Sequence, residues 1–246
     1  MFDIYINSTD SILLKFKQEI SPTINSQVLA LKERIERARC KFEILGIQEL
    51  VSAYASLLVY YDPFKLSLSS LKDFLENIKK ERLNIEEKSS LCMSVPLCYD
   101  EEFGLDLDFV CSHTRLSKDE LIKLHTKPFY RIYMLGFMAG FAYLGGLDER
   151  LFTPRLKSPR TSLESGCVGI ADKQTGIYPI KSPGGWQIIA RSPLSFFDKQ
   201  NESKPVLLEA GMFLKFKAID KKEYYEIKEA VDKKAYKREL YEYKGS

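Results

Sequence analysis

The chain has 246 residues, of which 45% are hydrophobic and 29% are charged. This length allows one large domain or two modest ones with a substantial core, and the composition is that of a globular protein rather than a disordered or fibrous one. The net charge of +3 is too small for the electrostatic footprint that nucleic-acid binding needs, so we expect no nucleic-acid partner.

The cysteines, histidines and N-terminus predict an intracellular protein without a metal site. Five cysteines, an odd number with no CxxC spacing, favour free thiols in a reducing compartment. With only two histidines, we expect no metal. No basic segment followed by an apolar run opens the chain, and the uncharged run over residues 132–147 is shorter than the roughly 20 residues of a spanning helix. We therefore expect a cytoplasmic protein that does not contact membranes.

Residues 1–88 predict a small α/β sandwich domain. A strand is expected over residues 11–16, and residues 50–61 give two strands with a break between them. Ser21 and Pro22 supply an N-cap and a first-turn proline for a helix. Apolar residues at helical spacing mark the inward faces of two helices: Val28, Leu31 and Ile35 in the first, and Leu68, Leu71, Leu75 and Ile78 in the second. The charged stretch over residues 79–90 is interpreted as a linker.

Residues 91–227 have a different residue pattern, which predicts a closed β-barrel or sandwich. A capping box over residues 117–120 begins one short helix, which Pro128 ends. From there to about residue 220 short strands alternate with Gly and Pro, as in an all-β domain. Residues 228–246 are expected to be a charged tail. A solvent-exposed helix is expected to begin at Lys221, with tyrosines that pack it partly against the rest of the protein.

The segment 169–186 concentrates four glycines, two prolines and the single tryptophan of the chain. Gln174 and Thr175 lie between turn-forming residues, where an amide and a hydroxyl can be held rigidly toward a planar amide or a carboxylate. Gly184 and Gly185 place open backbone beside Trp186, which is one way to build a small-molecule pocket. Glycines at barrel corners and a tryptophan in the core explain the same pattern about equally well.

Four arginines lie in this half of the chain, and we expect one of them to face a ligand, because guanidinium groups match carboxylates and phosphates. They are Arg131, Arg155, Arg160 and Arg191. His125, at the end of the capped helix, suits either proton transfer or a structural role, the latter being the commoner. The chain has no Gly-rich nucleotide motif, metalloprotease motif or serine-hydrolase motif. If ATP is used, a partner is therefore expected to supply much of its site.

Long stretches of the chain resemble one known family. These stretches are HTKPFYRIYMLGFMAGFAYLGGLDERLFTPRLKSPRT, SGCVGIADKQTGIYPIKSPGGWQIIARSPLSFFD, SLLVYYDPFKLSL and VPLCYDEEFGLDLDFV. These stretches resemble the family that contains the B subunit of 5-oxoprolinase (PxpB) and the sporulation kinase inhibitor KipI, also described as allophanate hydrolase subunit 1-like. The likeness extends to about residue 227. One departure is Ala139, which stands where many relatives have proline.

The resemblance implies an α+β protein with a small N-terminal α/β domain and a C-terminal cyclophilin-like β-barrel. It implies an enzyme subunit, inactive alone, that works with homologues of the A and C subunits of 5-oxoprolinase to open the lactam of 5-oxoproline to glutamate at the expense of ATP. ATP and Mg would be bound by, or shared with, those partners. Two alternatives stay open: a KipI-like inhibitor of sensor histidine kinase autophosphorylation, and part of an enzyme that acts on urea-derived amides.

Under this interpretation, the site must hold a planar amide and a carboxylate and must stabilise developing charge with fixed donors. The candidate catalytic residues are His125, Gln174 and Thr175. The candidate substrate-binding residues are Arg131, Tyr143, Arg160, Tyr178, Gly184, Gly185 and Trp186.

Overall fold

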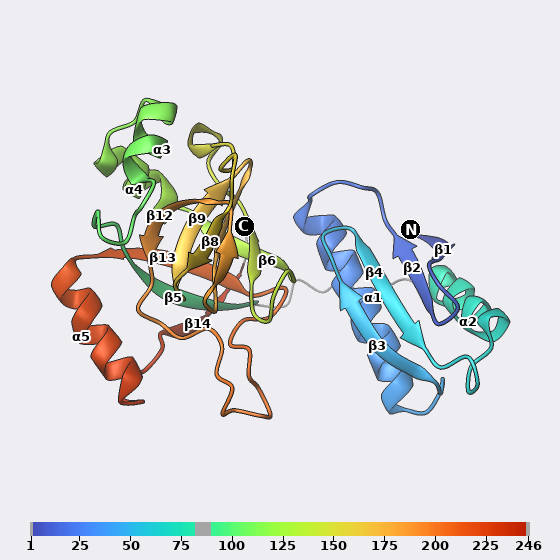
Figure 1. The fold of residues 1–246 in the computed structure, drawn as a ribbon. Helices are drawn as coiled ribbons and strands as arrows, with labels where there is room; N and C mark the ends of the chain where they lie inside the picture. Colours follow the sequence, from blue (N-terminus) through green and yellow to red (C-terminus); the bar gives the residue numbers. More distant parts are fainter. Residues whose placement is uncertain (1, 82–89, 245–246) are drawn as a thin grey trace. The chain divides into compact units, whose positions relative to one another are not determined.

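The computed structural model describes residues 2–81 and 90–244. The chain divides into two compact units, Met1–Lys88 and Ser89–Ser246, and each has its own sheet and its own hydrophobic core (Figure 1). The mixed α and β class is therefore confirmed. The predicted linker over residues 79–90 starts inside a helix, and its residues 82–89 lie outside the described part of the chain.

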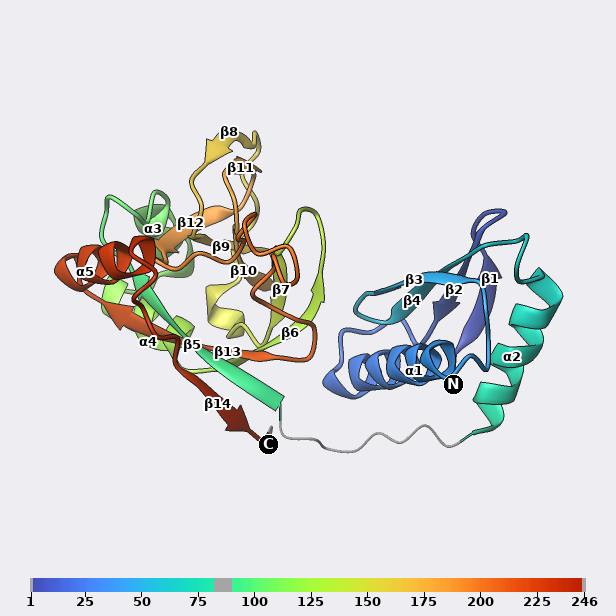
Figure 2. The ribbon, with the colours of Figure 1, turned by 90° about the horizontal axis from the view of Figure 1, so that it is seen from below.

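The N-terminal unit is a four-stranded antiparallel sheet in the order β1-β2-β4-β3. Two helices lie on the same side of this sheet (Figure 2), and both contribute to one core with the strands. The elements are β1 (Asp3–Ile6), β2 (Ser11–Lys15), α1 (Pro22–Cys40), β3 (Ile47–Ser52), β4 (Ser56–Tyr61) and α2 (Leu68–Lys80).

Both helices begin and pack as the apolar spacing predicts. Ser21 is the N-cap of α1 and Pro22 lies in its first turn, although the Ser21 side chain makes no capping hydrogen bond. The predicted inward residues of α1 are fully buried. In α2, the Ser67 hydroxyl caps the helix by accepting a hydrogen bond from the Ser70 N–H at 3.1 Å. Three of its four predicted inward residues are buried, whereas Leu68, in the first turn, is only partly buried.

Seven strands of the C-terminal unit close into a barrel, as the sequence predicts. The ring runs β5-β12-β9-β10-β7-β6-β13 and returns to β5, and the bridge between Arg191 of β12 and Cys98 of β5 closes it. A small sheet of β8 (Arg160–Leu163) and β11 (Ser182–Gly184) lies outside this ring (Figure 2). The ring strands are β5 (Ser90–Cys98), β6 (Phe129–Leu135), β7 (Ala142–Gly145), β9 (Cys167–Ala171), β10 (Gln174–Ile177), β12 (Gln187–Arg191) and β13 (Phe213–Ile219).

Two short helices precede the second barrel strand, and the sequence predicts only one of them. The predicted helix is α4 (Lys118–Thr126), whose capping box between Ser117 and Glu120 is present. The helix α3 (Leu107–Thr114) is not predicted. A single-turn 3-10 helix, η1 (Glu149–Leu151), follows β7.

The C-terminal tail contains a helix and also a strand. The helix predicted from Lys221 is α5 (Lys221–Asp232), with Tyr224 buried. Beyond it, β14 (Leu240–Tyr243) pairs antiparallel with β5, and the Tyr243 ring stacks on Phe129 at 4.1 Å between centroids. The sequence does not predict this strand. None of the helices in the described residues has both the length and the apolar character needed to cross a bilayer.

The N-terminal core should depend on α1. Leu31 is fully buried in that core, so Leu31→Ala should lower the free energy of unfolding by about 2–5 kcal/mol, because it leaves a cavity. Urea unfolding followed by far-UV circular dichroism measures this loss. Lys32→Ala, one residue along the same helix and partly exposed, is the control; a loss below about 1 kcal/mol in Leu31→Ala would contradict the packing described.

Candidate functional site

The predicted site residues fall on two sides of the barrel wall, because side chains alternate along a strand. In β10, Thr175 and Ile177 point into the barrel, where Ile177 joins the main core and Thr175 meets a residue of α4. Gly176 faces outward, toward Trp186. Gln174 shares that outward face and is half-buried. The two neighbours Gln174 and Thr175 therefore lie in different environments.

The inner group is a buried hydrogen-bond network around His125. Its Nδ1 lies 2.7 Å from the Tyr99 hydroxyl and its Nε2 lies 2.9 Å from Thr175 Oγ1. The Thr175 hydroxyl donates its only proton to the Gly169 carbonyl at 3.0 Å, so it accepts from His125 Nε2–H. The Tyr99 hydroxyl then donates to the unprotonated Nδ1.

His125 is consequently a neutral core residue. It is fully buried, and burial lowers its pKa to about 3, since the charged form is penalised away from water. Because the ring is neutral, it carries no positive charge that the helix dipole of α4 could stabilise. Both ring nitrogens are engaged within the protein, so the geometry gives no support to the catalytic roles predicted for His125 and Thr175. The network instead fastens α4 to β10.

The outer group is built around Trp186, whose side chain packs against two glycines. Gly176 of β10 is directly opposite Gly169 of β9 on one side and Tyr143 of β7 on the other. A Cβ atom on Gly176 would lie 2.9 Å from Trp186 Cζ3, and one on Gly169 would lie 3.0 Å from Trp186 Cβ. Two adjacent strands thus lack side chains at paired positions, and Trp186 packs against both, its indole over Gly176 and its Cβ atom over Gly169.

Aromatic rings enclose the indole. Phe141 meets it edge to face at 5.4 Å between centroids, and Tyr143 and Tyr178 each lie at 6.4 Å. Trp186 is only 5% exposed, so it is a core residue of this cluster rather than an open pocket wall. Tyr178 is 1% exposed, and burial raises its pKa to about 12, which keeps its hydroxyl protonated. We call these four rings the Trp186 cluster.

Gly184 and Gly185 differ in the room that each position leaves for a side chain. Gly184 is buried, and a Cβ atom there would lie 2.5 Å from the Tyr178 hydroxyl oxygen, so packing alone requires glycine. At Gly185 a Cβ atom would lie 3.5 Å from Pro159, an ordinary contact. The Gly185 carbonyl accepts a hydrogen bond from the Leu156 N–H at 2.8 Å.

Arg160 is held by an ion pair inside the protein. Its guanidinium bonds both carboxylate oxygens of Asp106, at 2.6 and 3.0 Å, and Asp106 also accepts from the Ile188 N–H at 2.6 Å. Because Asp106 is 8% exposed, removing Arg160 would leave a nearly buried carboxylate without its cation. The geometry therefore supports a structural role in place of the predicted substrate-binding one, and the pair fastens β8 to the start of α3.

Arg131 also lies apart from the Trp186 cluster. Its guanidinium is 5.7 Å from the centre of the Phe213 ring on β13, and burial lowers its pKa. The arginine that does reach the cluster is Arg155, whose guanidinium lies 5.8 Å from the centre of the Trp186 ring. The sequence places Arg155 among four candidates, and no local pattern distinguishes it from the other three.

Around Trp186 the accessible groups form a polar rim. Arg155 bonds Asp172 through Nε at 3.2 Å, and both side chains are more than half exposed. We define the Trp186 rim as Tyr143, Arg155, Asp172, Gln174 and Gly185. It offers a cation, an amide and a phenol, which suit a small polar anion. Among the residues that the structure describes, no group of three His, Cys, Asp or Glu side chains is arranged to hold a metal ion.

Residues 2–208 match the family model described as carboxyltransferase domain, subdomain C and D. The chain belongs to this family. Among its relatives, this carboxyltransferase-domain protein is 39% identical to the B subunit of 5-oxoprolinase from Bacillus subtilis (strain 168) over 229 residues, which cover 89% of the chain and 93% of the relative. It is 42% identical to the B subunit of 5-oxoprolinase from Haemophilus influenzae over 170 residues, 69% of the chain and 78% of the relative. The resemblance drawn from the sequence motifs is thereby confirmed.

The family fold recurs in a much larger protein. The crystal structure of urea carboxylase from Kluyveromyces lactis superposes with a TM-score of 0.81 at 20% identity, covering 98% of this chain but only 24% of that one. At this identity, the likeness shows a shared fold.

The two glycines beneath Trp186 give a stability prediction. Gly176→Ala should lower the free energy of unfolding by about 1–3 kcal/mol, because the new methyl group overlaps the indole and the Ala142 carbonyl. Fluorescence of the single tryptophan in a urea titration should also shift, since the ring must move. Gly185→Ala, where only an ordinary contact arises, should change neither measurement; equal effects in both variants would refute the packing account.

The buried neutral histidine gives a pH prediction. The unfolded chain binds a proton at His125 near the ordinary pKa of 6.5, whereas the folded chain does so only near 3. Stability should therefore fall as the pH drops from 6.5 toward 3, by up to about 1.4 kcal/mol per pH unit from this group. Urea unfolding at several pH values should show a shallower slope in His125→Gln than in the parent. His113→Gln, which alters the exposed histidine, should keep the parent slope.

Proposed function

We propose that the chain is the B subunit of an ATP-dependent 5-oxoprolinase, which hydrolyses the lactam of 5-oxoproline to L-glutamate together with homologues of the A and C subunits. The observation that carries this proposal is the match to the B subunit of 5-oxoprolinase over 93% of the relative's length at 39% identity. A match of that extent covers both units of the chain rather than one shared module.

The Trp186 rim is the place we propose for contact with this substrate. 5-Oxoproline is a small lactam with a planar amide group and a carboxylate. Arg155 can pair with that carboxylate in place of its exposed partner Asp172, because an exposed ion pair is worth little and exchanges readily. Gln174 presents an amide on the same outward face of β10, of the kind that pairs with a lactam N–H or carbonyl. Tyr143 supplies an adjoining aromatic wall.

The described residues do not fit a complete ATP site. The chain has no glycine-rich phosphate loop, and Arg160 of β8 is already paired with Asp106. No acidic cluster suitable for a metal ion is found in residues 2–81 and 90–244. We therefore assign ATP and Mg to the partner subunits and derive no step through them. It follows that this chain should be inactive alone.

Three further elements complete the proposal. The barrel is proposed to be of the cyclophilin-like type, and the N-terminal unit an α/β sandwich. We place the complex in the cytoplasm, where ATP is present and where the five unpaired cysteines stay reduced. Inhibition of a histidine kinase, and action on urea-derived amides, become outcomes of the experiment below.

Reconstitution tests the proposal directly. The chain is mixed with homologues of the A and C subunits, and ATP-dependent release of glutamate from 5-oxoproline is measured with each protein omitted in turn. We expect activity only from the complete mixture. If a folded, assembled mixture releases no glutamate, the proposal is wrong; urea-derived amides and inhibition of histidine kinase autophosphorylation would then be assayed with the same proteins.

A paired substitution locates the substrate contact within that assay. Arg155→Gln should raise the KM for 5-oxoproline about tenfold with little change in assembly, since one charge-assisted hydrogen bond is lost. Arg150→Gln is the control, because Arg150 is also exposed and paired with an aspartate of the same unit. Equal KM values in the two variants would remove the Trp186 rim from the substrate site while leaving the proposed place of the chain in 5-oxoprolinase intact.

A further inference from the structure

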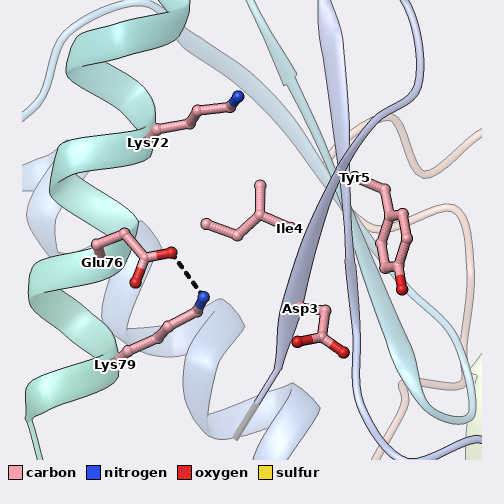
Figure 3. A pocket seen from close by; sticks show the side chains of 6 residues that line it. All are labelled: Asp3, Ile4, Tyr5, Lys72, Glu76 and Lys79. Carbon is pink, nitrogen blue, oxygen red and sulfur yellow. Dashed lines mark hydrogen bonds and ion pairs between the residues drawn. The ribbon is translucent and has the colours of Figure 1, made fainter.

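The N-terminal unit has a groove that the proposed enzymatic function does not use. It has a volume of about 470 Å³ and lies between strand β1 and helix α2 (Figure 3). The strand contributes Asp3, Ile4 and Tyr5, and the helix contributes Lys72, Glu76 and Lys79.

One wall of the groove is an unpaired sheet edge. β1 is the first strand in the order β1-β2-β4-β3 and pairs only with β2 in the described residues. Asn7 N–H donates to the Ser11 carbonyl at 3.1 Å, and hydrogen-bonded pairs alternate along an antiparallel ladder. With the register Tyr5 to Leu13, the backbone groups of Tyr5 therefore point toward β2. Those of Ile4 and Ile6 point outward, where another strand can bond them.

The side chains above this edge are the apolar Ile4 and three charged residues of α2, of which Glu76 is paired with Lys79. Ile4 points toward α2 and is half-buried against the N-terminal core, whereas Tyr5 points away from the helix (Figure 3). On the helix, Lys79 is engaged by Glu76 at 2.6 Å and lies 5.2 Å from the centre of the Phe2 ring. Lys72 has no ion-pair partner among the residues that the structure describes, which leaves its ammonium free to meet a ligand.

We propose that this groove binds an extended segment of a partner protein, which adds to β1 as a fifth strand and places an acidic side chain against Lys72. Strand addition to a sheet edge obtains affinity from main-chain hydrogen bonds and specificity from alternate side chains. The helix-facing side chains of the added strand meet Lys72 beside Ile4 and Ile6. The segment recognised is therefore one in which acidic and apolar residues alternate on one face.

A second copy of β1 fits this groove less well. In β1, Ile4 faces α2 and Ile6 lies on the same face of the sheet, whereas the only carboxylate of the strand, Asp3, lies on the other face with Tyr5. Pairing between two copies of β1 would therefore bring no negative charge to Lys72. The charge of the groove thus selects a different segment.

The first test uses the ¹⁵N-labelled full chain and synthetic peptides. The probe is acetyl-Glu-Thr-Val-Thr-Glu-Thr-amide, whose Glu and Val side chains share one face. Titration should shift the amide signals of β1 and α2, and should slow hydrogen exchange at Ile4 and Ile6. The same peptide with Lys in place of Glu should bind at least about tenfold more weakly. N-methylation of the valine, which removes a main-chain hydrogen-bond donor, should also weaken binding at least about tenfold.

Variants of the chain complete the test. Lys72→Glu should weaken binding of the acidic peptide at least about tenfold and reverse the preference toward the Lys peptide. Lys80→Glu, an exposed position on the same helix outside the groove, should change the affinity less than about twofold. If Lys72→Glu does not fold, Lys72→Gln replaces it in the binding measurement.

Three results would overturn the proposal. One is equal binding of the acidic and basic peptides; another is full affinity of the N-methylated peptide. The third is a concentration-dependent dimer in which Ile4 and Ile6 are protected from exchange before any peptide is added, because a second copy would then occupy the edge. Each result is independent of whether the chain supports 5-oxoprolinase activity.

Discussion

The outer face of the barrel depends on the absence of two side chains. Gly169 and Gly176 lie opposite each other on neighbouring strands, and the indole of Trp186 fills the space above Gly176, whereas the Cβ atom of Trp186 and the side chain of Ile188 fill the space above Gly169. An aromatic ring buried there gives a small region of the barrel surface its own core, separate from the one inside the barrel. Arg155 and the other groups of the Trp186 rim are positioned by that second core, so the accessible chemistry depends on a packing requirement of the strands beneath it.

Two polar arrangements hold the parts around the barrel in place. The pair of Asp106 with Arg160 connects α3, β12 and β8, and the network of His125 connects α4 to β10. In both, side chains of the types found in catalytic sites already form hydrogen bonds with other groups of the protein: His125 with Tyr99 and Thr175, and Arg160 with Asp106. This explains why the rim, which carries an exposed and exchangeable ion pair, is the better candidate for binding a substrate.

Local patterns in the sequence are sufficient for the elements that local forces determine. The apolar spacing of α1 and the capping box of α4 can be recognised because their residues are three or four apart. Contacts between distant residues cannot be predicted in this way: Asp106 and Arg160 are 54 positions apart, and His125 and Thr175 are 50 apart. The glycines near Trp186 indicate a special backbone, but whether they make room for a ligand or for the indole depends on strand register.

The return of the C-terminus to the barrel sets a limit on where the chain can be shortened. β14 covers the outer edge of β5 next to the buried Cys92, and Tyr243 anchors it by stacking on Phe129. A fragment ending at residue 227 would expose this strand edge together with the Phe129 ring on which Tyr243 stacks. Bare edges of that kind pair with other chains. Strand β14 therefore protects the edge of β5 from pairing with other chains.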